Sequence, residues 1–251
     1  MHDLITTRHS KVPPVTIAFW LIKIAATTLG ETGGDTLSMS FNLGYAVATA
    51  VFFPLFVASV VAQVRAKQYH PFLYWLVIVT TTTAGTTIAD FADRSLGIGY
   101  TGGMLILFAL VLLVLGAWRA TLGSVSATEI FSAKAEAFYW AAILASNTLG
   151  TAMGDFTSDD SGLGYLGSAG FFSVLLLGLA GLYFWTKTSR VLLFWAAFIL
   201  TRPLGATLGD FLTKPVSHGG LHFSRPVASA VLAVAMVAGI VWANRRRAPP
   251  G

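Results

Sequence analysis

The sequence predicts an all-α membrane protein of eight transmembrane helices, arranged as four parallel two-helix repeats with both termini in the cytoplasm. Two observations predict this fold class: long uncharged apolar stretches and one motif that recurs four times. Of the 251 residues, 55% are hydrophobic and only 11% are charged, whereas about a quarter of the residues of a soluble domain are charged. The composition therefore excludes an ordinary soluble globular protein.

Several stretches of at least 18 residues contain no charged residue, and four of them are predicted here as apolar membrane helices. A helix of that length crosses the roughly 30 Å hydrocarbon layer of a membrane, and continuous apolar runs differ from the alternating pattern of β-barrel strands. The chain has no cysteine, which excludes disulfides and thiolate metal sites. The four stretches are 43–64, 101–118, 161–186 and 226–244.

A spaced motif divides the chain into repeats. Each copy is a tryptophan, nine residues, a glycine, three residues, a small residue and then an aspartate, and an aromatic residue precedes each tryptophan. An apolar stretch follows each copy, so each repeat is expected to contain one motif helix and one apolar helix. The four copies are Trp20/Gly30/Gly34/Asp35, Trp75/Gly85/Ala89/Asp90, Trp140/Gly150/Gly154/Asp155 and Trp195/Gly205/Gly209/Asp210.

The expected helices follow from this alternation, with the odd-numbered ones carrying the motif. Because each repeat contains two spans, all four copies enter the membrane from the same side. Gly-Tyr follows the first three aspartates at a fixed distance, whereas the fourth repeat has Gly219-Gly220 there. The expected helices are 14–36, 43–64, 71–91, 100–118, 136–156, 165–186, 191–211 and 225–243. The repeats span about 15–70, 71–135, 136–190 and 191–245, within a single transmembrane domain, 1–251.

The basic residues gather at one end of the expected helices. The termini and the loops between repeats hold 11 of the 16 Lys and Arg residues, and the opposite ends hold eight of the 11 acidic residues. By the positive-inside rule, both termini are expected in the cytoplasm and the motif aspartates near the outer face. The sequence has no basic patch of the kind that binds nucleic acid, so no nucleic-acid partner is expected. The 11 basic residues are Arg8, Lys11, Arg65, Lys67, Arg119, Lys134, Lys187, Arg190, Arg245, Arg246 and Arg247.

The motif positions fall on one stripe of a helix, because at 100° per residue they lie within about 140° of one another. The two small residues of each copy form a small-xxx-small pair, which allows close approach of helices in lipid. The odd-numbered helices are therefore expected to meet through these stripes, with the even-numbered helices facing lipid.

The motif aspartates are the first candidate site residues. An acidic side chain inside a membrane is costly and usually functional, and several carboxylates on one axis repel one another unless a cation or a proton neutralises them. The alternative is structural: an aspartate that caps a neighbouring helix or binds a Tyr hydroxyl. The predicted ion-binding residues are Asp35, Asp90, Asp155, Asp210, Glu31, Thr86 and Thr151, and the acids among them are the predicted metal ligands.

Lys23 and Arg202 are the only basic residues inside the expected motif helices, and both lie on the motif stripe. They are predicted counter-ions or gating residues, each with a partner on another helix. For Lys23 the alternative is a side chain that extends to the cytoplasmic interface. Oxygen ligands without cysteine suit a hard divalent cation, and no other cofactor is expected. The histidines, expected in solvated positions, are His2, His9, His70, His218 and His222.

The four two-helix units, each with a tryptophan and a Gly-Asp or Ala-Asp ending, resemble a bacterial membrane family made of four tandem copies of a repeat of unknown function. This resemblance implies a multi-pass inner-membrane protein and no particular activity. The segment Glu31–Thr36, read as ETGGDT, is similar to the Glu-x-Gly-Asp-x-Thr signature of manganese and calcium exchangers. Here an extra glycine separates the acids, and the other repeats have Thr86, Thr151 and Ala206 in place of Glu31.

The sequence therefore predicts a polytopic transporter in which the repeat aspartates bind a cation, with a divalent ion such as manganese favoured. Its expected partners are the lipid bilayer and the transported cation or small solute. Two alternatives remain: a structural or accessory membrane protein, and a proton or small-solute transporter. Standard catalytic signatures are missing, so no enzyme is expected.

Overall fold

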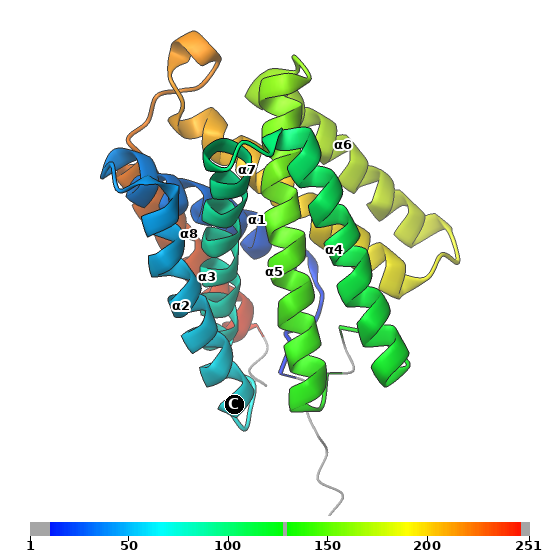
Figure 1. Ribbon diagram of the computed structural model, residues 1–251. Helices are drawn as coiled ribbons and strands as arrows, with labels where there is room; N and C mark the ends of the chain where they lie inside the picture. Colours follow the sequence, from blue (N-terminus) through cyan, green and yellow to red (C-terminus); the bar gives the residue numbers. More distant parts are fainter. Residues whose placement is uncertain (1–10, 128–129, 247–251) are drawn as a thin grey trace, which may run out of the picture.

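The computed structural model describes residues 11–127 and 130–246, which fold into eight long α-helices (Figure 1). They agree with the expected helices to within a few residues. The sequence observations on His2, Arg8, His9 and Arg247 lie outside the described residues. The helices are α1 Ile17–Asp35, α2 Gly44–Arg65, α3 Pro71–Asp90, α4 Gly99–Leu122, α5 Ala133–Asp155, α6 Gly164–Trp185, α7 Arg190–Thr213 and α8 Arg225–Arg245.

The four motif helices form a closed inner ring. α1 packs on α3, α3 on α5, α5 on α7, and α7 returns to α1. Each even-numbered helix packs mainly on the motif helix of the next repeat: α2 on α3, α4 on α5, α6 on α7, and α8 on α1. Figure 1 shows α2, α4 and α6 on the outside of the bundle and the connections between helices at its two ends. The first and last repeats are therefore joined as the others are.

Six of the eight helices are long and apolar enough to cross a membrane: α2, α3 with its extension to Ser95, α4, α6, α7 and α8. The outer helices expose many leucine, valine and phenylalanine side chains, as expected of surfaces that face lipid. The other two helices, α1 and α5, carry three charged residues each, as α7 does, and both belong to the inner ring. The structure thus supports a membrane protein. Eight spans and cytoplasmic termini remain predictions.

The chain turns in the same way after each of the first three motif aspartates. A five-residue π-helical turn follows each of them, at Thr36–Ser40, Phe91–Ser95 and Phe156–Asp160. The next helix then begins at the glycine of the Gly-Tyr pair, which has a φ of 74° at both Gly44 and Gly99. Residues other than glycine rarely adopt this φ. The recurring Gly-Tyr therefore marks a helix start.

We call the two ends of the inner ring the tryptophan end and the aspartate end, after the motif residues that lie there. At the tryptophan end, the aromatic residue before each tryptophan contacts the tryptophan of the next repeat. Tyr74 and Tyr139 also share a hydrogen bond between hydroxyls 2.8 Å apart. The ring-centroid distances are 5.5 Å for Phe19–Trp75, 5.6 Å for Tyr74–Trp140, 6.2 Å for Tyr139–Trp195 and 5.9 Å for Phe194–Trp20.

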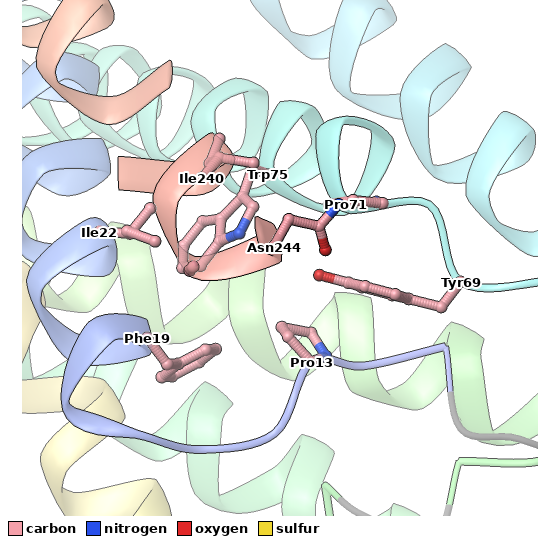
Figure 2. A pocket seen from close by; sticks show the side chains of 9 residues that line it. Pro13, Phe19, Ile22, Tyr69, Pro71, Trp75, Ile240 and Asn244 are labelled. Atoms are coloured by element: carbon pink, nitrogen blue, oxygen red, sulfur yellow. The ribbon is translucent and has the colours of Figure 1, made fainter. Parts of the chain in front are cut away.

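This aromatic layer fills the tryptophan end of the ring. A pocket beside it, which Figure 2 shows between Phe19, Trp75, Tyr69 and Asn244, measures about 10 Å³. That volume holds about one water molecule. Trp75, Trp140 and Trp195 are buried, so their rings pack inside the bundle and hold the repeats together.

Candidate functional site

The motif glycines bring the inner helices into close contact and direct polar side chains toward a common axis. A Cβ added at Gly30 would lie 2.2 Å from the Thr82 hydroxyl oxygen, and one at Gly205 would lie 2.2 Å from that of Thr27. In every repeat this glycine faces the residue seven positions after the next tryptophan. The four pairs are Gly30 with Thr82, Gly85 with Asn147, Gly150 with Arg202 and Gly205 with Thr27. The odd-numbered helices therefore meet through their motif stripes, as the small residues led us to expect.

Polar residues, with the one exception of Ala206, occupy three successive levels of the ring, one helical turn apart. They stand seven, eleven and fifteen positions after each motif tryptophan, and all of them are at most 3% exposed. The first level is Thr27, Thr82, Asn147 and Arg202; the second is Glu31, Thr86, Thr151 and Ala206; the third is Asp35, Asp90, Asp155 and Asp210. All nine predicted site residues belong to these levels except Lys23, which lies one turn closer to the tryptophan end.

Arg202 links the repeats at the second level. Its Nη2 lies 2.9 Å from Glu31 Oε2 and donates to the hydroxyls of Thr86 at 2.5 Å and Thr151 at 2.7 Å. These three acceptors are the second-level residues of the first three repeats. The fourth repeat has Ala206 there, so the Arg202 guanidinium meets no polar side chain of its own repeat at that level. This contact gives Arg202 the expected partner on another helix, and its role as a counter-ion or gating residue stays a prediction.

The third-level aspartates form two pairs, and one basic side chain bridges each pair. Lys214 Nζ lies 3.1 Å from Asp210 and 3.6 Å from Asp35, and Arg225 lies 3.5 Å from Asp35. Burial lowers the pKa of the Lys214 amine, but Asp210 and Asp35 outweigh it and hold that pKa well above its ordinary value. Lys214 is therefore charged at neutral pH.

Arg94 bridges the second pair. It lies 3.1 Å from Asp90, 3.2 Å from Asp155 and 3.9 Å from Asp159. Tyr100 completes this cluster, because its hydroxyl donates to Asp159 across 3.2 Å. Each bridging residue thus binds the aspartate of its own repeat and that of the next.

Arg94, Lys214 and Arg225 are not among the site residues predicted from the sequence. Arg94 and Lys214 each stand four positions after a motif aspartate, a spacing that places two side chains on one face of a helix. That spacing was the available signal. The second aspartate of each bridge belongs to the next repeat, and it comes within reach only because the motif helices pack in a ring. The alternative in which the aspartates cap neighbouring helices is wrong for the described helices, because α2, α4, α6 and α8 begin without a side-chain cap.

Three of the predicted metal ligands come together. Glu31, Asp35 and Asp210 each offer a carboxylate oxygen, and these oxygens lie within 4.8 Å of one another. Asp35 Oδ2 and Asp210 Oδ1 are buried, and both face Lys214 Nζ, at 3.6 Å and 3.1 Å. Three carboxylates match the oxygen ligands of a hard divalent cation. The predicted four-aspartate site is therefore divided, with Asp90 and Asp155 paired to Arg94 instead.

Lys23 lies apart from all of these carboxylates. Its side chain is fully buried, so the expectation that it extends to the interface is wrong. Its Nζ lies 3.7 Å from the centre of the Phe198 ring, and no described residue accepts a hydrogen bond from it. A cation over an aromatic face is stabilised by about 2 kcal/mol when it is desolvated.

The family comparison agrees with the four-fold architecture. A family described as "Repeat of Unknown Function (DUF347)" matches residues 18–69, 73–123, 138–189 and 193–248. The chain belongs to this family. No curated protein and no solved structure matches the chain, so the similarity of Glu31–Thr36 to manganese and calcium exchangers stays a prediction.

Proposed function

We propose that this DUF347 protein is a cation transporter of the bacterial inner membrane, with both termini in the cytoplasm and the aspartate end facing outward. One observation carries the proposal: carboxylate oxygens of Glu31, Asp35 and Asp210 lie within 4.8 Å of one another, and the charged amine of Lys214 contacts two of the three, Asp35 and Asp210. Buried acids in a membrane bundle mark ion pathways more often than they serve packing. The carboxylates come from the first and last motif helices, which meet where the ring closes.

Lys214 acts in this proposal as a tethered cation. Its ammonium group occupies the position that a free cation would take between Asp35 and Asp210. An arriving cation competes with this ammonium group for the carboxylates, and the Lys214 side chain then turns outward, away from Asp35 and Asp210. Lys214 directly follows α7, which ends at Thr213, so its backbone lies outside the regular helix.

A divalent ion suits the site better than a monovalent one. The three carboxylates carry up to three negative charges, and carboxylates, carbonyls and water are the ligands preferred by Mg²⁺, Ca²⁺ and Mn²⁺. Arg225 partly neutralises the site, because its guanidinium lies 3.5 Å from Asp35. We favour manganese, in line with the ETGGDT segment.

Arg202 controls passage beyond this site. Because it holds Glu31 at 2.9 Å and both second-level threonines, it closes the axis just below the carboxylates. A cation that moves toward the tryptophan end has to pass a buried guanidinium. Separation of Arg202 from Glu31 is therefore the gating step, and the aromatic layer at the tryptophan end is a second barrier.

The test is a thermal-shift titration of the purified protein with Mn²⁺, followed by Mn²⁺ flux in liposomes. Binding to the folded state raises stability by about 2.7 kcal/mol at a concentration of 100 Kd. Asp35→Asn and Asp210→Asn should abolish the shift and the flux. Asp90→Asn is the matched control, because it removes an equivalent motif carboxylate outside the cluster. Lys214→Met should tighten Mn²⁺ binding, because it removes the competing amine.

Equal responses from Asp35→Asn and Asp90→Asn would contradict the proposal. So would a wild-type protein that responds to none of Mn²⁺, Mg²⁺ and Ca²⁺. The second candidate, a structural or accessory membrane protein, would gain from that result. It is favoured by the bridges of Arg94 and Lys214, each of which ties two neighbouring repeats together. An enzyme is not proposed.

A further inference from the structure

Five basic residues lie away from the tryptophan end and its loops, and one of them, Lys23, has no carboxylate partner among the described residues. Four of them lie within 4 Å of a carboxylate: Arg94, Arg202, Lys214 and Arg225. Lys23 is the fifth, and no described carboxylate lies within that distance. It is completely buried on the axis of the ring. An unpaired ammonium group at such a position is costly, so a compensating negative group is expected there.

Other polar atoms near this level also lack partners. Arg202 uses Nη2 for all of its contacts, and its Nε and Nη1 bind no acceptor among the described residues. Neither side-chain atom of Asn147 makes a hydrogen bond there. Both residues are fully buried at the first level, one turn above Lys23. Buried polar groups are rarely left unsatisfied, and a cluster of them indicates a ligand or bound water.

The chemistry of the unpaired atoms identifies the kind of ligand. Four of the five are donors, on Lys23, Arg202 and Asn147, and two of these side chains are basic. Glu31 offsets the charge of Arg202, and no described carboxylate within 4 Å offsets a charge on Lys23. Water could satisfy the hydrogen bonds, but only an anion could also balance a protonated Lys23. We infer that the inner ring binds a small oxyanion, a carboxylate or an inorganic one, between Lys23, Asn147 and Arg202.

The walls of this site limit the size of the ligand. The residues equivalent to Lys23 in the other repeats are Ile78, Ile143 and Phe198, and all three are fully buried. A ligand with a long apolar or polar extension would meet these side chains. The aromatic layer with the Tyr74–Tyr139 hydrogen bond closes the axis one turn further on. The site therefore suits an anion with a few heavy atoms.

The experiment measures the thermal stability of the purified protein against sodium acetate and sodium phosphate at constant ionic strength, with chloride as the reference. One of the two salts should stabilise the wild-type protein. Stabilisation by acetate would indicate a carboxylate ligand, and stabilisation by phosphate would indicate an inorganic oxyanion. Lys23→Met should raise the basal melting temperature and weaken the anion response at least about tenfold, since each charge-assisted hydrogen bond contributes about 1.5 to 3 kcal/mol. Asn147→Leu should weaken the same response. Lys67→Met, a change at an exposed lysine, should behave as wild type.

Equal anion responses in wild type and Lys23→Met would overturn the inference. So would a flat wild-type response together with a more stable Lys23→Met protein, because Lys23 would then be a neutral buried amine. The inference does not depend on cation transport. Lys23→Met should keep the Mn²⁺ shift of wild type. If wild type showed the anion response but no Mn²⁺ shift, the cation site would be wrong and the anion site would stand.

Discussion

Arg202 and Glu31 lie 171 positions apart, yet a 2.9 Å ion pair joins them on the axis of the ring. One belongs to the last motif helix and the other to the first. The ion pair therefore joins the same two helices, α7 and α1, whose packing closes the ring. Both side chains are almost fully buried, so neither charge is stabilised by solvent.

The ion pair gives the first prediction. Arg202→Met should destabilise the protein by about 3 to 5 kcal/mol, because it leaves the Glu31 carboxylate buried without its partner. The double variant Glu31→Gln with Arg202→Met should recover much of that loss, since both charges are gone. Denaturation in SDS, followed by intrinsic fluorescence, measures both. A double variant no more stable than Arg202→Met would show that the two residues act independently.

Close helix contact gives the second prediction. Gly30→Ala should cost about 1 to 3 kcal/mol, because the new Cβ would lie 2.2 Å from the Thr82 hydroxyl and 2.6 Å from its Cβ. Gly33→Ala is the matched control on the same helix, because its Cβ would meet nothing within 4 Å. It should leave stability unchanged or raise it by up to about 1 kcal/mol. Similar melting temperatures for the two variants would disprove the contact.

The tyrosine pair at the tryptophan end gives the third prediction. Tyr74→Phe should cost about 1 to 3 kcal/mol, because the Tyr139 hydroxyl is left buried without its 2.8 Å partner. Phenylalanine at both positions should be nearly neutral, since no unsatisfied hydroxyl remains. A thermal-melt comparison of the single and double variants tests this. If the double variant lost as much as the sum of the two single ones, the coupling would be absent.

The fourth prediction concerns pH. The pKa of Lys214 is raised in the folded protein by Asp210 and Asp35, so its stabilising effect is complete below its unfolded pKa of about 10.4. The effect is lost only as the pH rises through the higher folded value. The difference in melting temperature between wild type and Lys214→Met should therefore stay constant from about pH 7 to pH 9.5. A difference that shrinks over that range would mean that the amine loses its proton earlier.

Much of the helical architecture could be predicted from the sequence. The apolar stretches and the motif spacing placed all eight helices to within a few residues, and the stripe of small residues predicted which helices meet. Arg202 was identified as a counter-ion because a basic residue on that stripe needs an acid. Arg94 and Lys214 were missed because half of their contacts come from neighbouring repeats.

The sequence by itself determined the repeat, the helices and the side of each motif helix that faces its neighbours, because helical periodicity and apolar length are local properties of the chain. Only the tertiary structure decided how the four aspartates are divided. Lys214 reaches Asp35 and Glu31 reaches Arg202 because α1 and α7 are neighbours in a closed ring. Ion pairing depends on distances of a few ångströms between residues far apart in sequence, and these distances are set by which helices pack together.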